Sequence, residues 1–152
     1  MASKKTAKPK SIINRRARFD YNIGETYTVG MELTGAEAKA LRLGHGQLTG
    51  AYVTIKDKEL WLLNATISGT GSIRIGDNEQ TRTRKLLAKK KEIDQIIEAK
   101  SQGKTIIPLE LLTQGRFIKL KIALAQGKKR YDKRQTIKKR EEDRQINRSL
   151  NR

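Results

Sequence analysis

The sequence contains no cysteine and a single histidine, His45, among its 152 residues. Without cysteine the chain has no disulfide framework and no thiol nucleophile; this is typical of cytoplasmic proteins, and we expect that location. One histidine without cysteine also provides no cluster of zinc ligands. Because His45 lies between glycines in "LGHGQ", we expect it in an exposed turn rather than in a catalytic or metal site.

Long apolar runs are missing as well, since no stretch approaches the ~18 residues that a membrane-spanning helix requires. The lysines near the N-terminus are not followed by an apolar segment, so we expect no secretory signal. Acidic residues are scattered beside lysine and arginine, and no pair suggests a general acid and base. The loop "GSIRIGDN" at residues 71–78 has Asp-Asn where a phosphate-binding loop requires Lys-Ser or Lys-Thr. We therefore predict that the protein is not an enzyme, needs no cofactor or metal and does not bind a membrane.

Positive charge is what the sequence has in excess, with 34 Lys and Arg against 16 Asp and Glu and a net charge of +18. Residues 1–18 have seven basic and no acidic residues, and residues 127–152 have eleven basic and four acidic residues. The part between them is nearly balanced. Such basic arms indicate a polyanionic partner, either nucleic acid or an anionic membrane. Because the tail has few apolar residues to insert into a lipid interface, we favour nucleic acid.

The first third of the chain predicts an arm, a strand and a helix. Residues 1–13 are small, polar and basic, and we predict that they are disordered. Between residues 21 and 33 most apolar residues occur at alternate positions, which predicts a half-buried strand that bends or bulges near Gly24. In "TGAEAKALRLG", Thr34 and Glu37 have the spacing of a capping box, so a short helix should begin there and end near the last glycine.

The elements of the middle and last thirds of the chain are predicted from turn residues and from the spacing of apolar residues. β-rich runs on both sides of Asp57-Lys58 predict a hairpin, and the glycine-rich residues 68–81 predict a loop. Apolar residues spaced by 3.6 residues from 84 to 102 predict a longer helix. "TIIPLELL" and "RFIKLKIALA" predict a second hairpin. In its last strand we expect five residues to face the core: Phe117, Ile118, Leu120, Ile122 and Leu124.

These elements together predict a mainly β fold with two or three helices. The small β-barrel of the oligonucleotide-binding (OB) type is the commonest arrangement with this set of elements, and a mixed α+β sandwich is the alternative. We place an OB-like β-barrel domain at residues 14–126. It is flanked by the disordered basic N-terminal arm, residues 1–13, and by a basic C-terminal tail, residues 127–152.

The tail, which starts with "GKKRYDKRQTIKKRE", has very little to bury. Its sizeable apolar residues are Tyr131, Ile137, Ile146 and Leu150. Burying so few side chains does not offset the entropy lost on ordering the segment. The tail is therefore either a spare extension or a segment that folds against another molecule.

Basic residues gather in four places: "NRRAR", "RTRKLLAKKK", the pair on the last strand, and the tail. A single cluster is as typical of a solvated surface as of a phosphate contact, but four in one small chain favour phosphate binding. Four rings, at residues 19, 21, 27 and 52, are able to stack on unpaired bases, although we favour core packing for them. RNA is the leading partner, and the candidate RNA-binding residues are Asn14, Arg15, Arg16, Arg18, Lys39, Arg82, Arg84, Lys85, Lys119, Lys121 and Lys128.

Five stretches resemble the SsrA-binding protein family, also called small protein B, in order and spacing. They are "NRRARFDYNI", "LTGAEAKALRLG", "TRTRKLL", "IKLKIALAQGKK" and "GKKRYDKRQTIKKRE", which together cover roughly residues 14–141. The resemblance implies an OB-type barrel that binds transfer-messenger RNA through its tRNA-like domain. It also implies delivery of that RNA, with elongation factor Tu bound to the same RNA, to stalled ribosomes in trans-translation. We expect the free protein to be a monomer.

For the tail, the resemblance implies disorder in the free protein and a helix in the empty mRNA channel, where it probes the decoding centre. The family ties the "DKR" triplet to ribosomal function. Two stretches depart from the family pattern: Thr28 stands where a glutamate is usual, and the loop at 68–81 lacks the usual proline- and histidine-containing sequence. The implied ribosome-binding residues are Gly127, Tyr131, Asp132, Lys133, Arg134, Ile137, Lys138 and Arg140.

Two other functions compete with this one. A generic OB-type RNA-binding or ribosomal protein would use the same basic arms to coat rRNA without selectivity. A hydrolase or transferase would use them to capture its substrate, but the sequence lacks a catalytic constellation for that role. Substitutions in the tail separate the first two functions, because a charge-driven binder should lose affinity in step with the charge removed.

Overall fold

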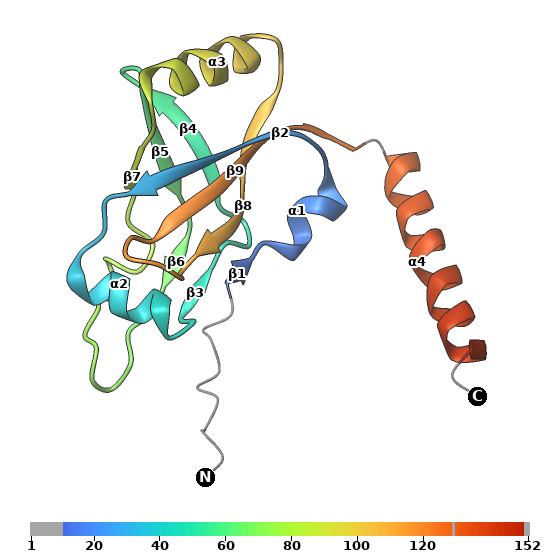
Figure 1. The fold of residues 1–152 in the computed structure, drawn as a ribbon, viewed down its shortest axis with the longest axis horizontal. Helices are drawn as coiled ribbons and strands as arrows, with labels where there is room; N and C mark the ends of the chain where they lie inside the picture. The colour runs from blue at the N-terminus through green and yellow to red at the C-terminus, as the bar shows by residue number, and fades with distance from the viewer. Residues whose placement is uncertain (1–10, 129, 151–152) are drawn as a thin grey trace.

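The computed structural model describes residues 11–128 and 130–150, with the backbone alone for residues 130–132. The fold is mainly β, as predicted, and consists of a strongly curved sheet with helices around its rim (Figure 1). The described residues form four helices rather than the two or three expected: α1 (Arg15–Asp20), α2 (Gly35–Arg42), α3 (Lys90–Ser101) and α4 (Arg130–Leu150).

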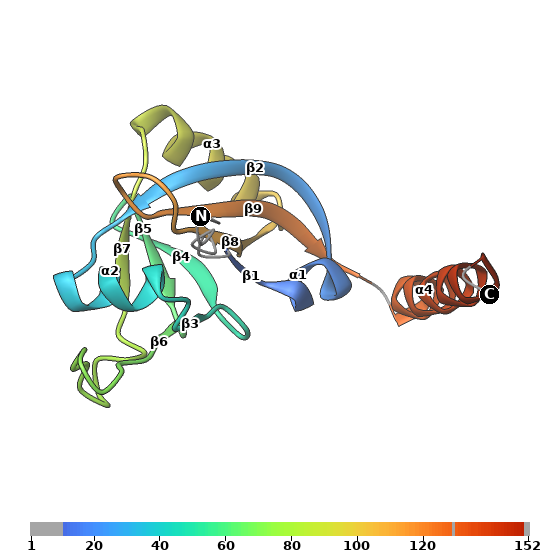
Figure 2. The same cartoon turned by 60° about the horizontal axis from the view of Figure 1, so that its bottom comes forward.

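Seven strands form one antiparallel sheet in the order β1-β8-β9-β2-β7-β5-β4. The first and last of these do not pair, but the sheet curls until β4 contacts β8, which gives a partly open barrel (Figure 2). Two short strands, β3 (Gly46–Gln47) and β6 (Thr66–Ile67), pair separately. The seven strands are β1 (Ile12–Ile13), β2 (Tyr21–Met31), β4 (Tyr52–Lys56), β5 (Glu59–Leu63), β7 (Arg84–Leu87), β8 (Thr105–Leu112) and β9 (Lys119–Gly127).

Strand β2 runs through the middle of the sheet and bends as predicted. Its register with β9 shifts between Ile23 and Thr26, next to Gly24. A Cβ at Gly24 would lie 2.9 Å from the carbonyl oxygen of Leu124, so only glycine fits this close approach of the two backbones. The bulge curves β2 around the barrel.

The core fills the inside of the barrel. Leu60, Leu62 and Leu120 are fully buried there, together with Leu41 of α2 and Ile96 of α3.

A second, smaller cluster lies outside the barrel, where Ala17 of α1 packs on Ile107, Leu109, Ala123 and Ala125. Strand β9 serves both clusters, since its alternate residues point to opposite faces.

Two predictions about these elements are wrong. Residues 84–87 are strand β7 rather than the start of a helix, because Arg84 and Leu86 are buried while Lys85 and Leu87 lie on the outer face. This period of 2 was hidden by chance matches to a 3.6-residue repeat. Phe117, expected to face the core, is 70% exposed because it lies in the turn before β9, whereas Ile118 and Leu120 are buried.

The N-terminal arm differs from expectation where the structure describes it. Ile12–Ile13, expected in the disordered arm, form β1 and pair with residues 110–111 of β8; residues 1–10 lie outside the described part. The tail is helical from Arg130 to Leu150 and extends away from the barrel (Figures 1 and 2), and its disorder in the free protein stays a prediction. Its residues are mostly good helix formers. None of the described helices is long and apolar enough to cross a membrane.

Candidate RNA-binding surfaces

The sequence-predicted site residues divide into two groups at opposite ends of β2. One group, which we call the α2-end surface, consists of Lys39, Arg82, Lys85, Lys119 and Lys121. The other, the α1-end surface, consists of Arg15, Arg16, Arg18, Lys128 and helix α4. An extended strand of this length spans up to about 35 Å, so the two surfaces are separate (Figure 1).

The α2-end surface is built on rigid strands. Lys119 and Lys121 of β9 lie opposite Gly30 and Thr28 of β2, and both point outward because their neighbours Leu120 and Ile122 fill the core.

Gly30 also pairs with Leu87 of β7, whose side chain is 48% exposed. The two lysines therefore lie near an exposed apolar side chain, a combination that suits phosphates on one part of an RNA and a sugar or base on another. Lys39 is exposed on α2.

Thr28 is exposed on β2 directly opposite Lys121. It has no charge to offset that lysine. In the described residues Lys121 makes no ion pair, although Glu110 of β8 lies opposite it on the other side. A glutamate, which the resemblance to the SsrA-binding protein family implies at this position, would place a second carboxylate beside this lysine; with threonine this part of the α2-end surface is more basic.

Arg84, predicted to bind RNA, is fully buried and is instead a structural residue. Its Nε donates to the Glu37 carboxylate at 2.5 Å. Its two terminal nitrogens donate to four backbone carbonyls, those of Ala65, Glu79, Gln80 and Arg82, at 3.0–3.1 Å. All five guanidinium N–H groups are thus used, and Arg84 ties β7 to the glycine-rich loop and to the segment before β6.

Glu37 is the other half of this buried network. It occupies the third position of α2, where Thr34 and Glu37 form the predicted capping box. Its carboxylate also accepts hydrogen bonds from Arg82 and Arg84. Burial alone would raise the pKa of this carboxyl, but the bonds from Arg82, from the Thr34 amide and from Arg84 outweigh it and hold the pKa below its ordinary value.

Two basic residues next to Arg84 keep part of their side chains on the surface: Arg82, just before β7, and Lys85 of β7. Arg82 remains partly exposed while bonded to Glu37, with a side chain exposed by 34%. Lys85 forms an ion pair with Glu59 of β5 at 3.1 Å. Of these two members of the α2-end surface, Lys85 is the more easily released because its partner is exposed.

Asn14, predicted to bind RNA at the α1 end of the molecule, is buried instead. Asn14 is 7% exposed and its side-chain amide donates to the Pro108 carbonyl at 2.9 Å, so it anchors α1 to β8 rather than facing a ligand. The three arginines of α1 are exposed, because Ala17 is the residue that packs against the sheet. Arg16 forms an ion pair with Asp20 at 3.4 Å.

The first turns of α4 lie beside α1. Lys133 forms an ion pair with Asp20 at 3.4 Å, and the Arg140 guanidinium lies 5.8 Å from the centre of the Phe19 ring. Lys128 donates its backbone N–H to the Asp20 carbonyl and its Nζ to the Thr136 hydroxyl.

The other cationic face of α4 is open to solvent. Arg134 and Lys138 are exposed, and Ile137 is 44% exposed. Gly127 pairs with Tyr21 at the end of β9. The side chains of Tyr131 and Asp132 lie outside the described residues.

Comparisons with known proteins cover both the barrel and the tail. The family model described as "SmpB protein" matches residues 11–152, which include the barrel and the tail. This chain belongs to the SmpB family.

Relatives named SsrA-binding protein extend the family match. That of Gloeobacter violaceus is 44% identical over the whole of both chains. That of Maricaulis maris is 47% identical over 95% of this chain and 97% of its own. A chain of the solved structure "tmRNA-SmpB: a journey to the center of the bacterial ribosome" is 35% identical, with a TM-score of 0.66 over 84% of this chain and 94% of that chain.

Two residues of the α2-end region in this SmpB family member were not predicted from the sequence, Arg42 and Leu87. Arg42 donates to the backbone carbonyls of Thr113, Gly115 and Arg116 and so fixes the turn between β8 and β9 next to Lys119. The exposure of Leu87 does not follow from the sequence, because the apolar spacing there predicts a helix and the residue lies in strand β7. In the described residues, no group of three or more His, Cys, Asp or Glu is placed to hold a metal ion, and His45 is exposed in a turn, as expected.

Proposed function

We propose that this protein is an RNA-binding adaptor of ribosome rescue. It binds the tRNA-like domain of transfer-messenger RNA through the barrel and carries that RNA to stalled ribosomes. The observation that carries the proposal is the match to the SmpB family over both barrel and tail. A barrel alone would support only a general RNA-binding role.

The α2-end surface supports recognition of a folded RNA. Its lysines stand on strands whose backbones are already fixed by the sheet, so binding requires little further ordering. Phosphate contacts from Lys119 and Lys121 would set the register, and the exposed Leu87 would contact a sugar or base. Arg82 contributes its exposed part, whereas Arg84 acts only by holding β7 in place.

The tail supports a separate contact with the ribosome. Helix α4 extends from the barrel with many exposed cations and few apolar residues, which suits a channel lined by rRNA phosphates. In this proposal "DKR", residues 132–134, and the exposed cations that follow probe the decoding centre and the empty mRNA channel. Elongation factor Tu joins through the shared RNA, and the protein acts as a monomer.

A gel-shift titration of the full chain and of residues 1–128 tests the proposal. The probes are the tRNA-like domain of transfer-messenger RNA and an ordinary tRNA. We expect both proteins to prefer the first RNA, because recognition lies in the barrel and truncation after β9 leaves the sheet intact. If neither protein discriminates and truncation removes most of the affinity, the chain is a charge-driven binder and the adaptor proposal fails.

A further inference from the structure

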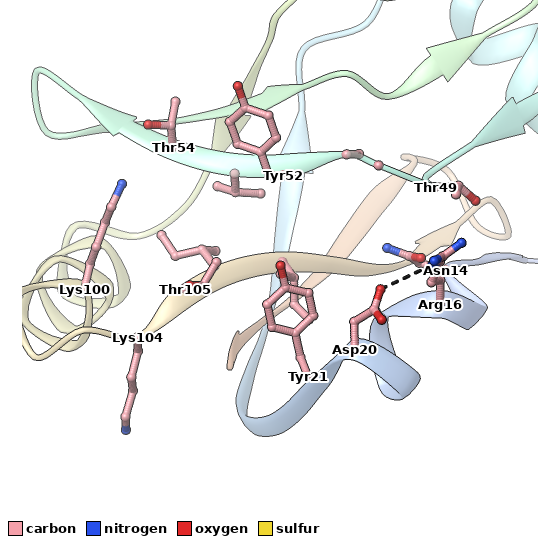
Figure 3. A pocket seen from close by; sticks show the side chains of 16 residues that line it. Asn14, Arg16, Asp20, Tyr21, Thr49, Tyr52, Thr54, Lys100, Lys104 and Thr105 are labelled. Atoms are coloured by element: carbon pink, nitrogen blue, oxygen red, sulfur yellow. Dashed lines mark hydrogen bonds and ion pairs between the residues drawn. The ribbon is translucent and has the colours of Figure 1, made fainter. Parts of the chain in front are cut away.

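A cleft of about 620 Å³ lies where the barrel is not closed by hydrogen bonds. Among the described residues β4 pairs only with β5, and β8 pairs with β1 and β9, so the seam between β4 and β8 is held by side chains. The start of β2, helix α1 and the end of α3 border the same cleft (Figure 3). In the order of the sheet this seam lies across the barrel from β2 and β7, away from the α2-end surface.

Two tyrosines line this cleft from different strands (Figure 3). Tyr52 is 43% exposed because the alternation of β4 directs Val53 into the core and Tyr52 outward. Tyr21 packs partly against the small cluster around Ala17, which fixes its ring, while the rest of the ring borders the cleft. Neither hydroxyl has a hydrogen-bond partner among the described residues. The core packing that the sequence favours is therefore wrong for Tyr52, whereas Tyr21 packs partly against a buried cluster.

Positive charge stands at both ends of the cleft. Lys100 and Lys104 lie at the α3 end, and Arg16 lies at the α1 end beside Asp20 (Figure 3). Asp20 is the one carboxylate among the residues that line the cleft, and it is already paired with Arg16 and Lys133. The cleft is therefore cationic overall and has exposed rings between its cations.

We propose that this cleft binds an unpaired segment of RNA. Bases stack on Tyr52 and Tyr21, while Lys100 and Lys104 at one end and Arg16 at the other bind the flanking phosphates. An acidic peptide would bind the same cations but has no bases to stack on the two tyrosine rings. In a duplex the bases stack on one another and are not available to the rings. The inference rests on the proposed function only in taking RNA as the polyanion.

The test measures binding of the full chain to a six-nucleotide single-stranded RNA that carries 2-aminopurine, whose fluorescence reports stacking. We expect wild type to quench the probe and to prefer it to the same sequence in a duplex. Tyr52→Ala should raise the Kd by between about fivefold and about 100-fold, the usual cost of losing one stacked base, and should reduce quenching. Tyr52→Phe should retain both binding and quenching, because the ring remains.

Two control variants lie outside the cleft. Phe117→Ala removes a ring that is 70% exposed near the turn between β8 and β9, and should leave the Kd for the hexanucleotide unchanged. Lys56→Ala with Lys58→Ala removes two exposed cations of the β4–β5 turn, for comparison with Lys100→Ala and Lys104→Ala. Tyr52 is exposed, so its replacement should not unfold the barrel; a thermal melt of each variant checks this.

The cleft proposal is overturned if Tyr52→Ala binds and quenches the probe as well as wild type does, or if Phe117→Ala weakens binding equally. It is also overturned if duplex and single strand bind alike. A parallel titration with the tRNA-like domain and ordinary tRNA keeps the two proposals apart. If the protein prefers the tRNA-like domain and Tyr52→Ala has no effect on the hexanucleotide, only the cleft proposal is overturned. If Tyr52→Ala weakens hexanucleotide binding but the protein does not prefer the tRNA-like domain, only the adaptor function is overturned.

Discussion

Glu37 is the residue on which the "TRTRKLL" stretch depends. Its carboxylate is 3% exposed and lies between one fully buried guanidinium, that of Arg84, and one partly exposed guanidinium, that of Arg82. A buried ion pair adds little net stability by itself, because both charges must be desolvated. Removing one partner is costly, however, since the other charge then stays buried and unpaired.

Glu37→Gln should therefore lower the free energy of unfolding by about 3–5 kcal/mol at neutral pH, because Arg84 loses its counter-charge. Urea denaturation followed by circular dichroism measures this. Glu59→Gln is the matched control: it breaks the pair between Lys85 and a carboxylate side chain that is 42% exposed, and should cost less than about 1 kcal/mol. Equal costs for the two variants would show that burial of the network contributes nothing.

The same network makes stability depend on pH. Because the pKa of Glu37 is lower in the folded protein than in the unfolded chain, its contribution is complete above the unfolded pKa and is lost as the pH falls through the folded pKa. Urea titrations at a series of pH values from 7 downward should show a steeper loss of stability for wild type than for Glu37→Gln. Parallel curves would assign the acid sensitivity to other carboxylates.

At the scale of elements, α4 has two faces with different roles. Lys133 and Arg140, seven residues apart and thus on one face, contact Asp20 and Phe19 of α1. Arg134 and Lys138 lie between them and are exposed. The contacts with α1 are few and partly solvated, so they orient the helix without holding it firmly. In the proposed function, such weak contacts would let the helix leave α1 for an rRNA surface that offers more phosphates.

Replacing Asp132, Lys133 and Arg134 by alanine should leave binding to the tRNA-like domain nearly intact and abolish tagging of stalled peptides. The reason is that the triplet lies outside the barrel, in the segment proposed to meet the decoding centre. A reconstituted tagging assay measures the outcome. A matched triple, Asp143→Ala with Arg144→Ala and Arg148→Ala, removes the same charges further along α4. If both triples reduce tagging equally, the tail acts by charge alone.

At the scale of the whole molecule, the net charge of +18 is distributed over separate surfaces. When a protein binds phosphates, the logarithm of its binding constant falls linearly with the logarithm of the salt concentration. The slope is set by the number of phosphates that the protein neutralises. The α2-end lysines are better targets for this test than Arg84, because their removal leaves the buried network untouched.

Lys119→Ala with Lys121→Ala should weaken binding to the tRNA-like domain and reduce the magnitude of the salt slope by about 2, one unit for each phosphate that is no longer neutralised. Binding measured between low and moderate salt gives the slope. Lys56→Ala with Lys58→Ala, on the β4–β5 turn, should leave the slope unchanged. An unchanged slope in the first variant would place the tRNA-like domain on another face of the barrel.

The sequence by itself determined those features that depend on residues close together in the chain or on amino-acid composition. The capping box of Thr34 and Glu37 is local, as is the turn at Asp57-Lys58, whose two positive φ angles suit a tight hairpin. The basic arms are a matter of composition. The motifs that carry the family resemblance were also read directly from the chain.

Only the tertiary structure decided which side chains face outward and which surfaces lie together. Arg84 is buried because the strands next to it set the face that it occupies, Phe117 is exposed because it lies in a turn, and strand pairing joins residues far apart in the chain. The cleft exists because the last strand of the sheet meets β8 without pairing to it. Such contacts depend on the whole fold, so neither local propensity nor charge predicts them.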